Sequence, residues 1–299
     1  MSNPTPVRRF TQDSEAQAQW RAPTLQQSGN MQGLIKSGKI LIGSCLSYPS
    51  RHVAKSIAIT GADWCWIDAE HVAWSQKLLV ECIQIIIHES AGKMIPVVRV
   101  PSKTAFDYMA WCLDAGAGGI IVPHLETTEE MKEVIGACRF PPLGHRSFPP
   151  FTFAPGITDI TPEGETVFSL ANKHVAIIPQ IESRLGIKSL EAIMRMDQIN
   201  AFMIGAGDLR LEMGMSLSMT GDEPEFVAAV EKATKVSKDT GIPLLGAAIG
   251  PEMVKLRLNQ GFRMLAVTMD VHALVFTTIA QVGEAREAAE AHMQSIHGN

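Results

Sequence analysis

Short apolar runs alternate with longer amphipathic segments along most of the chain. The runs predict eight strands, at 39–45, 64–68, 94–99, 119–123, 175–181, 201–205, 243–248 and 264–268. Several of them are apolar almost throughout rather than alternating, which is typical of parallel strands covered on both faces. We therefore expect a parallel sheet with helices packed on its faces.

The segments between the runs predict helices. In residues 74–90 one stripe has helical spacing, formed by Leu78, Leu79, Cys82, Ile83, Ile86 and Ile87. Thr127 and Glu130 have the spacing of a capping box at the start of a helix over 127–139. Helices over 224–240 and 251–260 each begin with a proline in the first turn. An earlier helix over 24–37 is ended by Gly38.

Eight strands, each followed by a helical segment, predict an α/β fold of the (β/α)8 TIM barrel type, in about 260 residues. A doubly wound open sheet is the alternative. That fold usually has a glycine-rich phosphate turn after its first strand, and GSCLSYPS is not one. Residues 24–299 are predicted to form this single barrel domain. The polar residues 1–23 are predicted to be an N-terminal arm.

Residues 140–160 interrupt the alternation with five prolines, four phenylalanines and no apolar period. A loop of this length in a compact domain is usually functional or disordered, and its phenylalanines argue against disorder. It follows the fourth helical segment, at the N-terminal face of the predicted barrel. We expect it to serve a neighbouring subunit or the barrel rim.

Composition narrows the class of protein further. The chain has 299 residues, a formal net charge of −5 and a pI near 6.0, which argue against nucleic acid as the main partner. No stretch approaches the roughly 20 apolar residues of a membrane span, and the N-terminal residues lack a secretory apolar segment. Five cysteines without paired spacing predict reduced, buried thiols in a cytoplasmic protein.

Polar residues collect where the predicted strands end. Because (β/α)8 barrels carry their chemistry at the C-terminal ends of the strands, these residues are the site candidates. They are Asp68, Glu70, His71, Arg99, His124, Gln180, Glu182, the 205–208 turn and Asp270.

Glu182 and Asp208 end two consecutive strands, 26 residues apart. That spacing is about one βα unit, so both carboxylates are expected at one edge of the sheet. Two carboxylates with few cations nearby in sequence favour a hard oxygen site for Mg²⁺ or Mn²⁺. The alternative is that both residues start helices and satisfy free N–H groups.

The remaining candidates suit proton transfer on a 2-oxo acid. Arg99 could stabilise a developing enolate oxygen, and a neutral His71 oriented by Asp68 could serve as the base. Gly205 and Gly207 at a helix start could present N–H groups to a carboxylate. No lysine ends a predicted strand, which disfavours Schiff-base chemistry.

Each of these candidates also has a structural alternative. Asp68 and Glu70 could cap the next helix, His71 could be a loop histidine, and Arg99 could lie on the surface. His124 is left open between the two readings. Asp270 is interpreted as the cap of the last helix.

Five ordered segments resemble the HpcH/HpaI aldolase family of class II pyruvate aldolases. They are WIDAEH at 66–71, PVVR at 96–99, VP at 122–123, PQIE at 179–182 and IGAGDL at 204–209. The resemblance covers about residues 30–285. The loop GHRSFPPFTFAPG looks most like the fungal macrophomate-synthase branch of this family.

The resemblance implies a homo-oligomeric barrel, a trimer or a hexamer, whose last helix is swapped between subunits. It implies a lyase that cleaves 4-hydroxy-2-oxo acids to pyruvate and an aldehyde, with oxaloacetate decarboxylation as a companion activity. The implied residues are the metal ligands Glu182 and Asp208 for Mg²⁺ (or Mn²⁺ or Co²⁺), the catalytic residues His71, Asp68 and Arg99, and the substrate-binding residues Gln180, Ala206, Gly207 and Trp66.

The sequence departs from the family at the loops. Ala69 and Val72–Ala73 flank the Glu-His pair, and the metal turn reads Gly-Ala-Gly-Asp. An Arg-Gly element of bacterial relatives is replaced at Arg146-Ser147. No tyrosine lies in residues 156–175 to match the one that positions a pyrone. Two alternatives therefore stay open: a fungal synthase that uses an oxaloacetate-derived enolate, and a non-catalytic barrel that binds 2-oxo acids.

Overall fold

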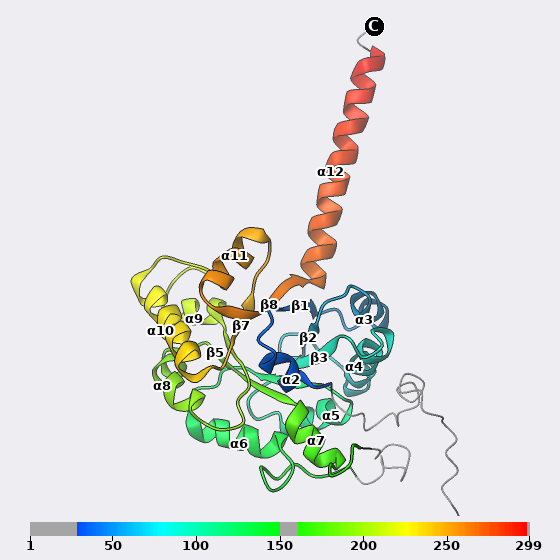
Figure 1. Ribbon diagram of the computed structural model, residues 1–299. Helices are drawn as coiled ribbons and strands as arrows, with labels where there is room; N and C mark the ends of the chain where they lie inside the picture. The colour runs from blue at the N-terminus through cyan, green and yellow to red at the C-terminus, as the bar shows by residue number, and fades with distance from the viewer. Residues whose placement is uncertain (1–28, 150–160, 298–299) are drawn as a thin grey trace, which may run out of the picture.

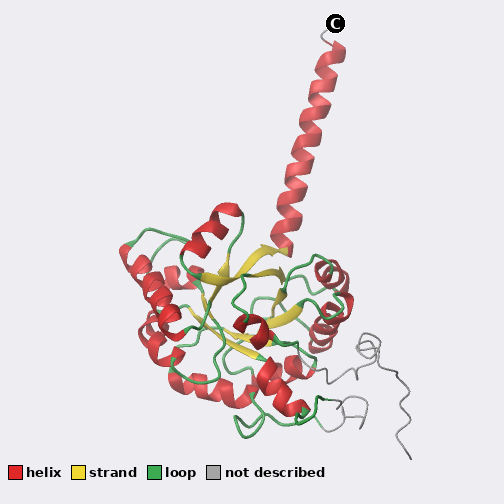
Figure 2. Ribbon diagram, in the orientation of Figure 1, coloured by secondary structure: helices red, strands yellow, loops and turns green. Residues whose placement is uncertain are grey.

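The computed structural model describes residues 29–149 and 161–297. The predicted arm at 1–23 lies outside the described residues, as does the 150–160 part of the proline-rich loop. The described residues form a barrel ringed by helices, with one long helix extending from it (Figures 1 and 2).

Eight parallel strands close into the barrel in sequence order, with β8 paired to β1. The strands are β1 (Leu41–Leu46), β2 (Trp64–Asp68), β3 (Ile95–Arg99), β4 (Gly119–Val122), β5 (Ala176–Ile181), β6 (Phe202–Ile204), β7 (Leu244–Ala247) and β8 (Phe262–Met269). This topology confirms the predicted (β/α)8 barrel and excludes the open sheet.

The helices between the strands cover the outside of the barrel, whereas α2 precedes β1 and α12 extends away from the barrel (Figure 1). The helices are α2 (Met31–Lys36), α3 (Arg51–Ala58), α4 (Gln76–Glu89), α5 (Phe106–Asp114), α6 (Thr128–Cys138), α7 (Val167–His174), α8 (Arg184–Met194), α9 (Ala206–Glu212), α10 (Pro224–Thr240), α11 (Pro251–Asn259) and α12 (Asp270–His297). The predicted capping box at Thr127 is present, and Pro224 begins α10 as predicted.

Two predicted elements differ from the structure. In the described part of the predicted helix over 24–37, α2 covers only Met31–Lys36, and it ends before Gly38, which has a φ of +75°. The eight-residue helix α7 was not predicted, because it follows the irregular loop and has little apolar period. It begins with a capping box formed by Thr166 and Ser169.

Side chains of alternating strand residues pack on the two sides of the barrel wall. The interior holds Trp64, Trp66, Ile178 and Met264, and Met31 of α2 packs into the same cluster. Gly43 permits this filling, because a Cβ there would lie 2.2 Å from the ring of Trp64. The part of the barrel interior that α2 packs into is therefore filled with apolar side chains. The polar site candidates lie at the opposite end, where the strands have their C-terminal ends.

The outer side of the barrel wall packs against the helices in a second apolar cluster. All five cysteines are free and buried, which confirms the prediction of buried thiols. Within the described residues, no helix is both long enough and apolar enough to cross a membrane.

Helix α12 extends away from the barrel as a single 28-residue helix (Figure 1). It carries several exposed apolar side chains, which are Leu274, Val275, Phe276, Ile279, Val282, Met293 and Ile296. A helix with this much uncovered apolar surface is typical of one that packs against a partner.

Candidate active site

Asp68 and Arg99 form a buried ion pair at the ends of β2 and β3. The two residues are register partners in adjacent parallel strands, so their side chains reach the same side of the barrel wall. Arg99 Nε and Nη2 donate to Asp68 Oδ1 and Oδ2, each at 2.8 Å. The guanidinium also lies 4.7 Å from the ring centroid of Trp66. Arg99 is therefore a fixed interior residue and not a surface one.

Glu70 and His71 continue from the end of β2 into the following loop. Arg99 Nη1 lies 3.0 Å from Glu70 Oε2, an ion pair without hydrogen-bond geometry. His71 Nε2 lies 3.5 Å from the same Glu70 oxygen, and the imidazole is 64% exposed. Ser75 caps the next helix, so neither acidic residue serves as that cap.

The structure places Asp68 differently from the sequence expectation that it orients His71. Both Asp68 oxygens accept from Arg99, and the carboxylate beside His71 belongs to Glu70. The reason is geometric: Asp68 is the last strand residue and points inward, whereas His71 lies three residues further along the loop.

Glu182 is a buried carboxylate after β5, with 2% of the residue exposed. Its Oε1 accepts the backbone N–H of His124 at 2.8 Å, and its Oε2 accepts a hydrogen bond from Gln180 Nε2. The N-cap of α8 is Ser183, so Glu182 is not a helix cap. Gly205 permits its position, because a Cβ there would lie 2.1 Å from Glu182 Oε2.

Burial raises the pKa of Glu182. The hydrogen bonds from Gln180 and His124 oppose this shift, while the charges of Asp208 and Glu70 add to it. Burial also raises the pKa of Glu70, against the lowering effect of Arg99 and His71. The charge of Asp208 raises the pKa of both acids, in keeping with its position after β6 at the same end of the barrel.

Asp208 lies in the first turn of α9, and its side chain is exposed. It acts electrostatically on both Glu182 and Glu70. Gly205, which precedes α9, donates its N–H to Ile181, so that group is used within the sheet. Ala206 and Gly207 are the first two residues of the helix, whose N–H groups have no acceptor inside it.

The residues present fit a divalent cation. Glu182 and Asp208 would supply two hard oxygen ligands, and Gln180 Oε1, on the side chain that contacts Glu182, is buried without a hydrogen-bond partner. In residues 29–149 and 161–297, no group of three or more His, Cys, Asp or Glu side chains is arranged to hold a metal. A two-carboxylate site suits Mg²⁺, which usually keeps several waters and takes further oxygens from the substrate.

Lys103 lies in the loop after β3, and His124 lies in the loop after β4, where its backbone N–H contacts Glu182. Lys103 Nζ is 2.6 Å from Glu130 Oε1 and 3.3 Å from Glu126 Oε2. Burial opposes the charged form, but these acids outweigh it and raise the pKa of Lys103. Lys103 therefore stays an ammonium ion and is a poor Schiff-base nucleophile. Sequence reasoning missed this lysine, because it belongs to a loop after Arg99.

The sequence candidate Asp270 and the loop residue Arg146 both belong to structural contacts. Asp270 starts α12 and accepts the N–H groups of Ser47 and Tyr48 at 2.9 and 2.8 Å, so it holds the β1–α3 loop as well as starting its helix. Arg146 is buried, with Nη2 2.5 Å from Asp114 Oδ1 of α5, and its guanidinium lies over the ring of Phe140.

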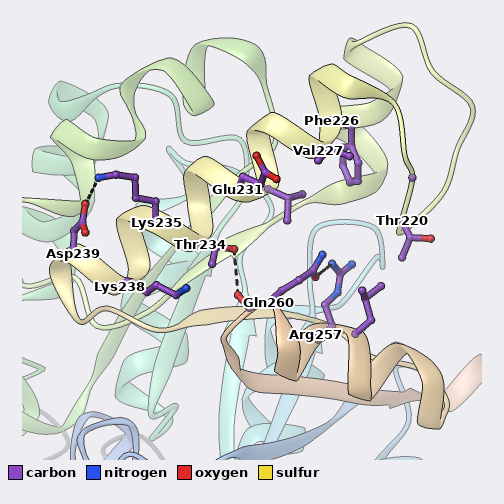
Figure 3. A pocket seen from close by; sticks show the side chains of 13 residues that line it. Thr220, Phe226, Val227, Glu231, Thr234, Lys235, Lys238, Asp239, Arg257 and Gln260 are labelled. Atoms are coloured by element: carbon purple, nitrogen blue, oxygen red, sulfur yellow. Dashed lines mark hydrogen bonds and ion pairs between the residues drawn. The ribbon is translucent and has the colours of Figure 1, made fainter.

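A separate cavity of about 550 Å³ lies between α10 and α11 (Figure 3). None of the candidate site residues lines it. Lys235 pairs with Asp239, and Arg257 donates to Gln260 and to the backbone carbonyl of Met219. These polar groups are satisfied within the protein, so the catalytic candidates remain those at the strand ends.

A (β/α)8 barrel with carboxylates, an arginine and a histidine at its C-terminal strand ends is typical of enzymes that act on small acids. The model of the HpcH/HpaI aldolase/citrate lyase family matches residues 46–276. The chain therefore belongs to this family of carbon–carbon lyases.

Individual relatives support the assignment. A hydroxypyruvate/pyruvate aldolase from Roseobacter denitrificans is 30% identical over 81% of this chain and 91% of its own. A 2-keto-3-deoxy-L-rhamnonate aldolase from Klebsiella pneumoniae is 29% identical over 80% of this chain and 85% of its own. The crystal structure of a macrophomate synthase aligns with a TM-score of 0.83 and 35% identity, covering 91% of this chain and 94% of that one.

Proposed function

We propose that this protein is a divalent-metal-dependent lyase that forms a pyruvate enolate. It cleaves and forms 4-hydroxy-2-oxo acids and also decarboxylates oxaloacetate. The observation that carries this proposal is the pair of carboxylates, Glu182 and Asp208, at the same end of the barrel as the Asp68–Arg99 pair. Among the described residues, neither forms an ion pair with a lysine or arginine. The aldolase relatives support it.

Glu182 and Asp208 would hold Mg²⁺, or Mn²⁺ or Co²⁺ in its place. When bound, the cation would supply Lewis-acid polarisation of the keto group. Arg99 carries five N–H donors, of which two are used on Asp68, so others remain for an enolate oxygen. Asp68 holds the guanidinium in a single orientation.

His71 is the candidate base that moves a proton, directly or through water. Its exposure leaves it accessible to a substrate, and Glu70 lies beside it, with the two side chains 3.5 Å apart. In this arrangement Asp68 acts on Arg99, while Glu70 connects Arg99 to His71.

The 2-oxo acid itself would lie between Gln180 and the first turn of α9. Gln180 Oε1 and Trp66 Nε1 are buried polar atoms without hydrogen-bond partners, and such atoms usually await water or a ligand. The backbone N–H groups of Ala206 and Gly207 would receive the substrate carboxylate, as the resemblance implies.

Pyruvate release from 4-hydroxy-2-oxo acids tests this function. The purified protein is incubated with a series of these acids and Mg²⁺, and pyruvate is measured by its reduction with a coupled dehydrogenase. Oxaloacetate loss is followed in parallel. We expect metal-dependent turnover of both. If a folded, metal-loaded protein turned over neither, the proposal would be wrong.

The likeness to a macrophomate synthase favours one second candidate. A synthase that joins the same enolate to a special acceptor would decarboxylate oxaloacetate but cleave simple 4-hydroxy-2-oxo acids slowly. The ratio of these two rates distinguishes the candidates, because only the aldolase is expected to cleave simple 4-hydroxy-2-oxo acids readily.

We also propose that the protein is a cytoplasmic homo-oligomer in which α12 packs on a second copy. The exposed apolar residues of α12 and the buried free thiols support this proposal. Light scattering on Ile279→Asp should show a smaller particle than the wild type. Gln281→Asp, which adds the same charge on the same helix, is the control. An unchanged mass in Ile279→Asp would contradict the packing of α12.

A further inference from the structure

Lys103 contacts the loop that follows β4 and the first turn of α6, close to the buried carboxylate of Glu182. It lies in the loop after β3, and its ammonium group contacts the loop that leads from β4 into α6. Its Nζ donates to the backbone carbonyl of His124 at 3.1 Å. The same atom forms ion pairs with Glu126 and Glu130.

The backbone of His124 connects Lys103 to Glu182. It has a φ of +54°, a left-handed conformation that is unfavourable for a residue with a Cβ. Its carbonyl is held by Lys103, and its N–H donates to Glu182 Oε1 at 2.8 Å. The unusual backbone of His124 is therefore fixed from both sides, and it orients one oxygen of Glu182.

Glu126 gives a second connection to the same place. Its Oε2 faces Lys103, and its Oε1 accepts a hydrogen bond from Ser183 Oγ at 2.7 Å. Ser183 directly follows Glu182 and caps α8. Lys103 is thus connected, through Glu126, to the side chain of the residue just after Glu182, and through His124 to the Glu182 carboxylate itself.

The ammonium group also prevents repulsion between two neighbouring acids. Glu130 accepts the backbone N–H groups of Glu126 and Thr127, so its carboxylate stays beside that of Glu126. Without Lys103, two carboxylates would face each other with no cation between them. The loop from 124 to 130 would then be expected to open away from β5.

We propose that Lys103 is a positioning residue that holds the metal ligand Glu182 in its binding orientation through His124 and Glu126. This inference rests on the proposed function, because it takes Glu182 as a ligand. Partners that orient a metal ligand typically change metal affinity by about 10- to 100-fold when they are removed.

Manganese binding in the absence of substrate tests the proposal. Mn²⁺ is titrated into the full-length protein, and free Mn²⁺ is measured by electron paramagnetic resonance. We expect Lys103→Met to raise the dissociation constant about 10- to 100-fold and Lys103→Arg to restore most of the loss. Lys132→Met is the matched control, because Lys132 lies on α6, the helix that carries Glu130, and forms an exposed ion pair with Glu129.

Rates separate positioning from a general structural defect. At saturating Mn²⁺, the kcat of Lys103→Met should approach the wild-type value, because the ligands and Arg99 are intact. If Lys103→Met does not fold, Glu126→Gln removes one of the two connections and should give a smaller rise in the same constant. An unchanged dissociation constant in folded Lys103→Met would overturn the inference.

A different result of the same titration would contradict the proposed function itself. If wild-type protein and Glu182→Gln bind Mn²⁺ equally, Glu182 is not a ligand. In that case the proposed function and this inference both fail. If Glu182→Gln loses binding while Lys103→Met keeps it, only the role of Lys103 is wrong.

Discussion

Two pairs of acids share the C-terminal end of the barrel, and they differ in how their charge is balanced. Asp68 and Glu70 face Arg99, which forms two hydrogen bonds with the first and an ion pair with the second. Glu182 accepts hydrogen bonds only from the neutral groups of Gln180 and His124, and exposed Asp208 adds a second negative charge nearby.

The difference indicates which of the two pairs would bind an external cation under the proposed function. The β2–β3 acids carry their own counter-ion, so they can fix the guanidinium in one place. The β5–β6 acids have no lysine or arginine within ion-pair distance in the described part of the chain. Burying such a charge is costly unless it is paired, and a bound divalent cation would supply that pairing.

Replacing Glu182 with glutamine should have the largest effect on activity. The variant keeps the shape but loses the buried charge that would hold the cation. We expect proton exchange of pyruvate to fall by about a thousandfold, because Lewis-acid stabilisation is worth several kcal/mol. Exchange is measured by proton NMR. Glu191→Gln, at an exposed position on α8, is the control and should keep wild-type exchange.

Replacing Arg99 tests the balanced pair. Arg99→Met leaves the buried Asp68 without its cationic partner, which should destabilise the fold by about 3–5 kcal/mol. Arg99→Lys keeps the charge but loses the two-point contact, and we expect exchange to fall about 100- to 1,000-fold. Thermal unfolding and exchange rates are measured together, with exposed Arg195→Lys as control. Wild-type exchange in Arg99→Lys would remove Arg99 from the mechanism.

Asp208→Asn should affect metal affinity more than stability. The side chain is exposed, so the free energy of unfolding without metal should change by less than about 0.5 kcal/mol. The Mn²⁺ dissociation constant should rise roughly tenfold or more, since affinity follows the number of charged ligands. Asp222→Asn, another exposed aspartate, should leave the constant unchanged. Equal constants in both variants would exclude Asp208 as a ligand.

The smallest effect is expected in the pH dependence of stability without metal. Burial raises the pKa of Glu182 above its ordinary 4.5, so the folded state binds this proton more tightly than the unfolded chain. The contribution of Glu182 to stability is therefore fully present below pH 4.5. It is lost as the pH rises through the raised value.

Glu182→Gln should consequently have a higher Tm than the wild type at neutral pH without metal. The difference should shrink as the pH falls toward 4.5, and Mg²⁺ should raise only the wild-type Tm. Thermal unfolding at several pH values, with and without EDTA, measures this. A wild-type protein that stays more stable than Glu182→Gln at neutral pH without metal would contradict the cost assigned to the buried charge.

The barrel could be predicted from the sequence because its strands are buried on both faces and its helices carry regular caps. The runs ending at Asp68 and Arg99 correspond to β2 and β3 as observed. The same reasoning could have paired these two residues, since each is the last residue of a neighbouring parallel strand.

The rest of the site depends on loop paths that have no sequence period. His71 lies in a loop, and its neighbour Glu70 could not be preferred over Asp68 from spacing alone. Lys103 contacts a loop more than 20 residues away, so only the folded chain brings it near Glu182. Helix α7 was missed for a related reason, because capping rather than apolar periodicity marks its start.

Proton NMR of pyruvate in D₂O tests the central claim most directly, since it reports enolate formation whatever the acceptor. The full-length protein is measured with Mg²⁺ and then with EDTA. We expect the methyl signal to disappear with Mg²⁺, to persist with EDTA, and to persist in Glu182→Gln under both conditions. Persistence of the signal in folded wild-type protein with Mg²⁺, or its loss in the presence of EDTA, would show that the protein does not form a metal-dependent pyruvate enolate.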